Sequence, residues 1–454
     1  MADESTELTP DEVVLEELRA MLEEGQVTDA VTLLEELHPA DQAQVLSHLD
    51  AESRAPLLPR IPQEGLAEIL SFLDEETRHH IVVELEAAVL GPLLDLVERD
   101  VAVDILHQLD PELAREALAG MTRALDVAPL LRHPDETAGG RMTSDFVALN
   151  GEWTVDQALS HLRRTKPDVE QAFYLYVVDD ERRLEGVVSL RQLIVAAPEV
   201  RVAELMTPDV VSVEASEDQE EVARRVARYN FVALPVVDAG RHLIGVISVD
   251  DVMDVAEEEA TEDMYRLAGL TEDESLLRPV GRSLLPRLGW LLIALVSVTG
   301  AAAVVNAFEG TIERVVALAV FMPMIAALGG NAGIQTITLV VRSLALGKVE
   351  IRDVRRVLQR EMTLGVANGM IVGLLVGALA YVWKDNVALA VIAGVAMLLN
   401  MATAVTAGVL VPLSLRALRL DPALASGVLV TTFTDVLGLF IFLGLATLMV
   451  ERLA

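Results

Sequence analysis

Long hydrophobic runs separated by short polar segments dominate the chain after Arg287. A helix that crosses a bilayer needs about 20 residues. For such uniformly apolar runs, length rather than hydrophobic periodicity indicates a membrane-spanning helix. The runs that reach this length cover residues 288–308, 315–341, 362–383, 387–415 and 422–450. The pattern therefore predicts a membrane domain of five helices within residues 276–454.

Basic residues are distributed unevenly among the segments that connect these runs. Only Arg314 and Lys384 follow the first and third runs, whereas the segments after the second and fourth runs contain Arg342, Lys348, Arg352, Arg355, Arg356, Arg360, Arg416 and Arg419. Basic loops stay in the cytoplasm. We therefore expect a protein of the plasma (inner) membrane with cytoplasmic N-terminal domains and an external C-terminus. The first residues, MADESTELTPDEVV, include no signal-peptide hydrophobic run, which agrees with this topology.

A hydrophobic residue recurs every 12 positions from Leu37 to Leu109. Helix-start signatures such as HPAD, DEET and DPEL follow several of these positions, with Asp or Pro where it can cap or begin a helix. Units of this length cannot bury a face alone, so they must stack on their neighbours. The period predicts an α-helical superhelix over residues 1–134.

The pattern then changes to short strands alternating with helices, and it occurs twice. AFYLYVVDDERRLEGVVSLRQLI (172–194) aligns with FVALPVVDAGRHLIGVISVDDVM (231–253). Each copy contains the pieces of a βαββα unit. The tandem, over residues 135–198 and 199–251, resembles a pair of cystathionine-beta-synthase-type (CBS) domains. That resemblance implies a regulatory α/β module that in some members binds adenine nucleotides such as ATP, with Ser248 and Asp250 expected near the ribose.

A strongly acidic connecting helix is expected over residues 252–275. Between Asp250 and Asp263 there are eight acidic residues and no basic one, and apolar residues recur at Val252, Ala256, Ala260, Met264 and Ala268. Like charges at this spacing destabilise a helix. A solvated helix face is one explanation of the charge run, and neutralisation by hard divalent cations is the other.

Charge and composition exclude several classes of function. Residues 288–454 contain 9 acidic and 11 basic residues out of 70 and 35 in the chain, so the negative charge is N-terminal. Such a surface repels nucleic acid and attracts cations. The absence of cysteine excludes disulfides and thiolate metal sites, and no histidine lies in a predicted span. We therefore expect a protein that is not an enzyme.

One carboxylate, Asp435, interrupts the uncharged run VTTFTDVLGLFIFLGLA (430–446). At the centre of a bilayer it costs roughly 2.5–3.5 kcal/mol, which packing alone does not offset. Other polar or small residues at this depth are expected to face a partner helix or water. They are the segment GGNAGIQT (329–336), Asn400, Thr431, Thr432 and Thr434.

With DETAGGRMT (135–143), the tandem repeats, the acidic connector, GGNAGIQT and TDVLG (434–438), the chain closely resembles the MgtE family of magnesium channels. The resemblance implies a homodimer whose ten spans surround a pore on the two-fold axis. It also implies that cytoplasmic Mg²⁺ joins the acidic domains and a connecting plug helix, and so closes the pore.

The same resemblance implies roles for individual residues. Asp435 is the pore carboxylate, and Asn230 stands where a carboxylate is expected, so an ion site there is weaker or absent. The implied pore lining consists of Pro323, Gly329, Gly330, Asn331, Gly333, Asn400, Thr431, Thr432 and Thr434. The implied regulatory Mg²⁺ ligands are Asp218, Glu220, Asp251, Asp254, Glu259, Glu262 and Asp263, with Asp95 and Asp104 in the N-terminal domain.

Two other functions remain open from the sequence. An ion-coupled secondary transporter with a cytosolic regulatory module would need ionisable groups in several spans and an internal repeat. We find one central carboxylate and no repeat. A membrane-anchored sensor or intramembrane enzyme would need a nucleophile with a positioned base, and the spans contain neither cysteine nor histidine.

Overall fold

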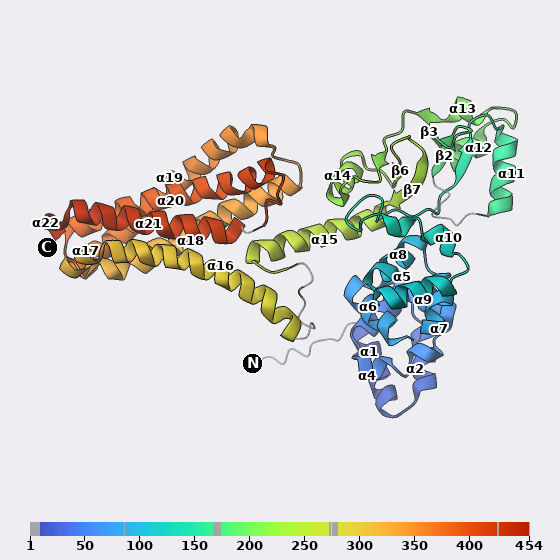
Figure 1. Cartoon of the computed structure of the whole chain (residues 1–454), viewed down its shortest axis with the longest axis horizontal. Coiled ribbons are helices and arrows are strands. Elements are labelled where there is room, and N and C mark those ends of the chain that lie inside the picture. The colour runs from blue at the N-terminus through green and yellow to red at the C-terminus, as the bar shows by residue number, and fades with distance from the viewer. Residues whose placement is uncertain are drawn as a thin grey trace. The chain divides into compact units, whose positions relative to one another are not determined.

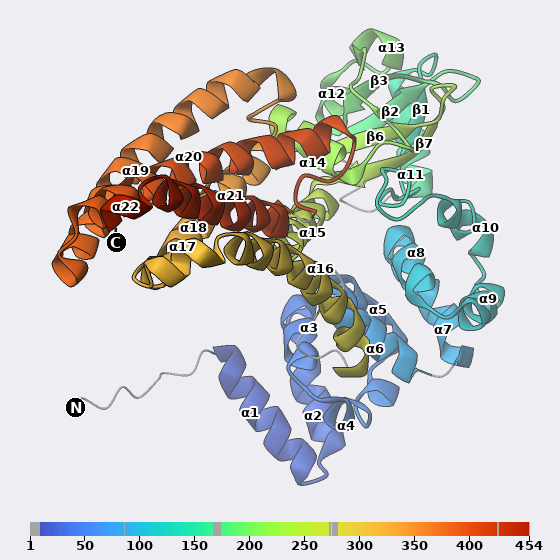
Figure 2. The same ribbon diagram turned by 60° about the vertical axis from the view of Figure 1, so that its left-hand side comes forward.

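The computed structural model describes residues 10–85, 87–166, 174–271, 274, 280–424 and 426–453. The chain divides into two compact units, Met1–Val255 and Ala256–Ala454, and each is described by itself. Figures 1 and 2 show the first unit in blue to green and the second in yellow-green to red.

Short helices form the N-terminal part of the first unit, as the 12-residue period predicts. They are α1 (Pro10–Glu23), α2 (Val27–Glu35), α3 (Pro39–Ser47), α4 (Ala51–Arg54), η1 (Leu58–Arg60), α5 (Gln63–Phe72), α6 (Glu75–Glu84), α7 (Ala87–Leu94), α8 (Arg99–Gln108), α9 (Pro111–Gly120), α10 (Ala124–Val127) and η2 (Leu130–Arg132). The helical N-terminal domain is confirmed.

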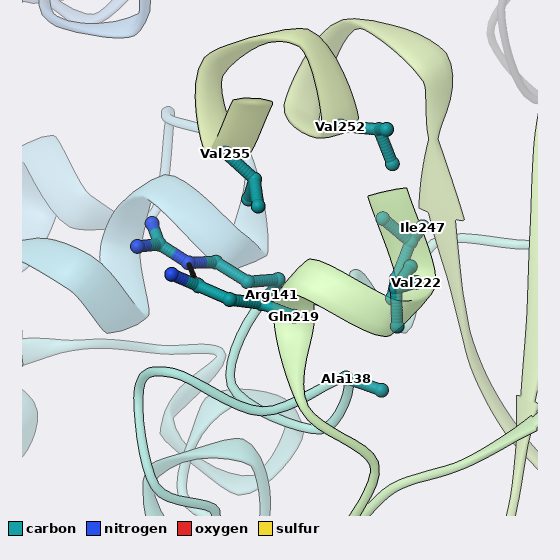
Figure 3. A pocket seen from close by; sticks show the side chains of 7 residues that line it. All are labelled: Ala138, Arg141, Gln219, Val222, Ile247, Val252 and Val255. Atoms are coloured by element: carbon teal, nitrogen blue, oxygen red, sulfur yellow. Dashed lines mark hydrogen bonds between the residues drawn. The ribbon is translucent and has the colours of Figure 1, made fainter. Parts of the chain in front are cut away.

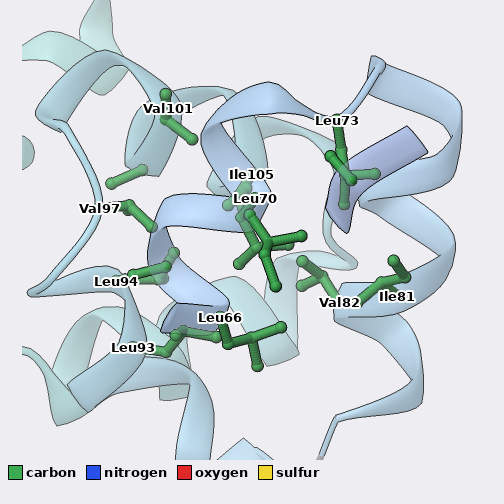
Figure 4. Packing of buried hydrophobic residues seen from close by; sticks show 14 of the residues in the cluster. Leu66, Leu70, Leu73, Ile81, Val82, Leu93, Leu94, Val97, Val101 and Ile105 are labelled. Atoms are coloured by element: carbon green, nitrogen blue, oxygen red, sulfur yellow. The ribbon is translucent and has the colours of Figure 1, made fainter. Parts of the chain in front are cut away.

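The periodic hydrophobic residues lie at the joints between these helices. Leu73 has an extended backbone, is buried, and is followed by Asp74, whose side chain accepts a hydrogen bond from the backbone N–H of Thr77 and caps α6. Leu109 likewise ends α8 before Asp110 begins α9. Figure 4 shows Leu73 among the side chains that fill the core of this stack. The periodic residue thus packs the joint between helices, and at Asp74 the next residue also caps the following helix.

Two small sheets confirm the tandem CBS repeat. The first has the order β1 (Ala148–Asn150), β2 (Tyr174–Val178), β3 (Leu184–Ser189) and β4 (Thr207–Pro208), and the second β5 (Val213–Glu214), β6 (Ala233–Val237) and β7 (Leu243–Ser248). Gly186 pairs with Val177, and Gly245 pairs with Val236 at the matching position. The accompanying helices are α11 (Val155–Thr165), α12 (Leu190–Val195), α13 (Val202–Leu205) and α14 (Gln219–Tyr229).

The segment that enters the first repeat is paired with the sheet of the second. Thr143 pairs with Val246 of β7, and the Met142 side chain covers Gly245 as that of Met206 covers Gly186. A Cβ atom at Gly245 would collide with the Met142 sulfur, so the site requires glycine. The boundary predicted at residue 135 assigns this segment to the first repeat, although the segment packs on the second repeat.

The connecting helix α15 (Val249–Ala268) is one continuous helix. Val252 and Val255 are buried in it, whereas Met264 is 61% exposed and Ala256 and Ala268 are also exposed. The apolar residues that recur at a spacing of four therefore do not form one buried face in this structure. The buried positions are three residues apart because only the first turns of α15 pack on the CBS pair.

The described residues of the second unit form five helices long and apolar enough to cross a membrane, which confirms the predicted number. They are α16 (Val280–Ala307), α18 (Leu318–Ala345), α19 (Val354–Lys384), α20 (Val387–Ala417) and α21 (Ser426–Leu448); shorter elements are α17 (Glu309–Arg314), η4 (Ile351–Asp353) and α22 (Val450–Leu453). Pro323 lies inside α18, which is continuous through it.

Glycine residues permit a close contact between α19 and α20 in the membrane domain. Gly365, Gly369, Gly373 and Gly377 recur every fourth residue on the face of α19 that packs on α20. A Cβ atom at Gly373 would lie 2.6 Å from the carbonyl oxygen of Gly394. This close approach supplies van der Waals contact where the bilayer provides no hydrophobic force between helices.

Candidate functional site

Asp435 lies on the side of α21 that faces α16 and α18. Thr431, one turn before it, packs on Gly330 of α18, and the Thr432 hydroxyl is hydrogen-bonded to that of Ser297 in α16. Val436 packs on Gly300 of α16. Residues three and four apart share a helix face, so Asp435 lies between the face of α21 that contacts α16 and the face that contacts α18. We call this place the seam. The Asp435 side chain is partly exposed there.

An unpacked polar stripe follows α18 next to this seam. Asn331, Gln335 and Thr338 are exposed on three successive turns, and Pro323 is exposed two turns before Asn331. Asn331 directly follows Gly330, so the stripe begins beside the crossing of α18 and α21. Sequence reasoning selected Pro323 and Asn331 but missed Gln335 and Thr338. The signal for them was that, after Asn331, a polar residue recurs on the next two turns of an otherwise apolar helix.

Several residues expected to line the pore pack inside the protomer instead. Asn400 is fully buried and its Nδ2 donates to the carbonyl oxygen of Ile325 at 2.8 Å. A Cβ atom at Gly329 would collide with the same Nδ2. Gly333 packs against Val430, and Thr434 is completely buried. Within this protomer Gly329, Gly333, Asn400 and Thr434 therefore stabilise helix contacts, and their place in a pore wall stays a prediction.

The remaining threonine hydroxyls use their protons on their own helix. Thr431 donates to the Gly427 carbonyl at 3.0 Å and Thr432 to the Val428 carbonyl at 2.7 Å. Such bonds satisfy the donor and leave oxygen lone pairs as acceptors. Gly330 is buried beneath Thr431, so it permits the contact without itself facing the seam.

A second carboxylate, Glu361, lies in the N-terminal third of α19, one residue before the predicted span. It is buried, accepts a hydrogen bond from the Thr336 hydroxyl at 3.3 Å and pairs with Arg360 at 2.5 Å. Thr336 is on the buried side of α18, packed against Gly408. Glu361 therefore ties α19 to α18, and its charge is balanced locally.

In the first unit, the structure brings Asp251 of α15 close enough to Asp100 of α8 for their charges to interact. Asp100 is 7% exposed and its Oδ1 has no hydrogen-bond partner. Burial, together with the charge of Asp251, raises the pKa of Asp100 well above its usual range. Burial also raises the pKa of Asp251 to about 7, although a hydrogen bond from Ser248 opposes this rise. Sequence reasoning selected Asp251 and missed Asp100, because the contact joins remote segments.

The two N-terminal acids selected from the sequence differ in environment. Burial raises the pKa of Asp104 to about 6 against the opposing charge of Arg78, 3.8 Å away. Asp95 accepts hydrogen bonds from the Thr122 backbone and hydroxyl at 2.7 and 2.6 Å and from the Arg123 backbone at 2.9 Å. Burial raises the pKa of Asp95, but these bonds outweigh it and leave the pKa lowered. Asp95 therefore already has a structural role.

The other regulatory candidates lie on helix surfaces. Asp218 caps α14 through the Glu220 backbone N–H at 2.9 Å, and Glu220 pairs with Arg224 at 3.0 Å. Asp254 is exposed; Glu259, Glu262 and Asp263 are partly exposed. In the described part of the chain, no three carboxylate or histidine side chains are already arranged to hold a metal ion. Asn230 ends α14 in the left-handed conformation that asparagine accepts readily, so its position serves as a helix cap.

The expected nucleotide residues also have local roles. The Ser248 hydroxyl is hydrogen-bonded to the Asp251 carboxylate at the start of α15, and Asp250 is exposed. Nearby, Arg141 Nε donates to Gln219 Oε1 at 2.9 Å (Figure 3). The space between these side chains and Val252 does not admit a water molecule, so this junction is packing and leaves no room for a nucleotide.

Comparison with known families assigns each part of the chain. Residues 322–445 match the family described as divalent cation transporter, MgtE. Residues 37–136 match the MgtE intracellular N domain, and residues 138–199 and 202–258 match CBS domains.

Curated relatives cover almost the whole chain. The magnesium transporter MgtE of Thermus thermophilus is 38% identical over 96% of this chain and 98% of its own length. The protein of the same name from Bacillus subtilis is 30% identical over 98% and 99%. A crystal structure of the cytosolic domain of the Mg²⁺ channel MgtE in complex with ATP is 40% identical, has a TM-score of 0.50, and covers 53% of this chain and 99% of that one.

Proposed function

Because the chain belongs to the MgtE family of magnesium transporters, we propose that it is a Mg²⁺-conducting channel that cytoplasmic Mg²⁺ closes. The chain is a membrane protein with a cytosolic N-terminal domain and a CBS regulatory pair. In this proposal the membrane helices conduct Mg²⁺, and the acidic cytosolic domains sense it.

The placement of Asp435 carries the proposal for conduction. Its carboxylate lies partly exposed at the seam of α16, α18 and α21, beside the unpacked polar stripe that includes Asn331. Polar groups at bilayer depth require a polar neighbour. A homodimer with both stripes facing its two-fold axis supplies one, and it places two Asp435 charges opposite a doubly charged ion. Mg²⁺ keeps several waters and binds through one or two carboxylates, which suits a site that must release it.

The pair Asp100 and Asp251 supports the proposal for closure. Two buried carboxylates repel each other when both are ionised, and a divalent cation removes that repulsion. The unpartnered Oδ1 of Asp100 is available as a ligand. Binding of Mg²⁺ between α8 and α15 then stabilises the packed arrangement of the first unit, and α15 continues from that unit into the second.

Three further features belong to the same proposal. The C-terminus lies outside the cell, as the basic loops favour. The protein resides in the plasma (inner) membrane. The CBS pair takes an adenine nucleotide, by analogy with the related cytosolic domain that was crystallised in complex with ATP. Asp250 is exposed and available for such a ligand, whereas the Ser248 hydroxyl is engaged with Asp251.

Single-channel recording from the purified protein in a planar bilayer tests conduction. We expect discrete Mg²⁺ current steps that Asp435→Asn abolishes while the dimer still assembles. The matched control is Asp385→Asn, a loop residue in the left-handed conformation at the end of α19, where asparagine is well tolerated. Mg²⁺ flux that occurs without current steps and depends on a proton or sodium gradient would instead support a coupled transporter.

A further inference from the structure

The last turn of α15 is packed against the cytoplasmic ends of the membrane helices. Leu267 joins a buried cluster with Ile337 of α18 and Val430 of α21. A Cβ atom at Gly427 would lie 2.6 Å from the Leu267 carbonyl oxygen, so the two backbones are in close contact. α15 then ends at Gly269, in the left-handed conformation, against Trp290 of α16. All these residues belong to the second unit.

An ion pair reinforces this contact. Arg266 of α15 donates from Nη1 to Oδ2 of Asp421, in the loop between α20 and α21, at 2.5 Å. The same guanidinium pairs with Glu262 one turn earlier, so Glu262 is engaged before any metal ion binds. Both partners of the Arg266–Asp421 pair are about one-quarter exposed. The pair therefore joins elements 155 residues apart in the sequence at the membrane surface.

Asp421 also shapes the start of α21. Its Oδ1 accepts a hydrogen bond from the Ala423 backbone N–H at 2.8 Å, which fixes the turn before the helix. From Gly427 to Asp435 is about two turns of continuous helix, or roughly 12 Å. The Asp421 carboxylate thus accepts the hydrogen bond of the turn with Oδ1 and the hydrogen bond from α15 with Oδ2. It lies just before the N-terminus of α21, the helix that contains Asp435.

We propose that Arg266 and Asp421 position α21 by coupling it to α15, so that a shift of the acidic helix moves the helix bearing Asp435. The inference rests on the proposed closure by Mg²⁺ and names the contact that transmits it. Coupling requires a contact with two arrangements that both sites bias. A salt bridge between the end of the sensor helix and the start of the ion-site helix provides such a contact.

Two single variants and their double separate coupling from folding. Asp421→Asn retains Oδ1 for the Ala423 N–H and removes only the charge that Arg266 uses. Arg266→Gln removes the other partner. Arg419→Gln removes an exposed positive charge from the same loop and is the matched control. The readout is the ratio of Mg²⁺ flux at low and at inhibitory cytoplasmic Mg²⁺ in proteoliposomes of full-length protein.

We expect either single variant to lower this ratio about two- to fivefold, as loss of a partly exposed ion pair implies. The double variant should lower it no further, and flux at low Mg²⁺ should stay at the wild-type level because Asp435 is intact. An unchanged ratio in Asp421→Asn, or additive effects in the double variant, overturns the inference. A wild-type protein that Mg²⁺ does not inhibit overturns the proposed closure instead.

Discussion

Replacing Asp251 by asparagine should stabilise the contact between α8 and α15 when Mg²⁺ is absent. Asparagine keeps an oxygen for the Ser248 backbone N–H, which donates to Asp251 at 3.2 Å, so the start of α15 remains capped. It removes the charge that faces Asp100. It also removes one of the two proposed Mg²⁺ ligands, so the added ion should no longer stabilise this contact.

The magnitude follows from the pKa of Asp251, which burial raises from 3.8 to about 7. At about 1.36 kcal/mol per pH unit, keeping this carboxylate ionised above pH 7 costs up to about 4 kcal/mol. Asparagine also loses hydration on burial, so we expect a gain of roughly half this limit, about 2 kcal/mol. That gain corresponds to roughly a 30-fold higher protection of the amides that exchange when the contact opens.

Hydrogen exchange of the full-length protein at pH 8, read by mass spectrometry on peptides from α8, measures this effect. Wild type should gain protection when Mg²⁺ is added, and Asp251→Asn should already be protected without it. Glu257→Gln, which removes an exposed acidic charge further along α15, is the control and should behave like wild type. The reasoning is refuted if Asp251→Asn is no better protected than wild type without Mg²⁺, or if Mg²⁺ still adds the wild-type increment.

Two further outcomes are expected. Burial raises the pKa of Asp251 to about 7 and that of Asp100 well above its usual range, so the folded contact between α8 and α15 binds extra protons. Its Mg²⁺-free stability should therefore fall as pH rises from about 4 to 7. Mg²⁺ must displace these protons, so half-inhibition should need more Mg²⁺ at pH 6 than at pH 8, and an inhibition curve that does not depend on pH contradicts this. Gly329→Ala should displace the buried Asn400 amide and lower the free energy of unfolding by about 1–3 kcal/mol. The control Gly444→Ala has open space around the added methyl group and should leave the stability unchanged. Equal melting temperatures of the two variants contradict this expectation.

The order and type of the domains could be predicted from the sequence because each depends on local patterns. Capped 12-residue repeats indicate stacked short helices, paired strand motifs indicate the CBS tandem, and apolar runs of sufficient length indicate five spans. Asp435 was conspicuous for the same reason, since a lone carboxylate in an apolar run is visible without any knowledge of packing.

Only the tertiary structure decided which side of each helix is packed and which remote residues meet. Asn400 and Asn331 are equally polar in sequence, yet one is buried against Gly329 and the other is exposed. The pairings of Asp100 with Asp251 and of Arg266 with Asp421 join segments far apart in the chain. Hydrophobic periodicity reports that a face is buried, but the partner on that face is set by how whole helices fit together, which no local pattern encodes.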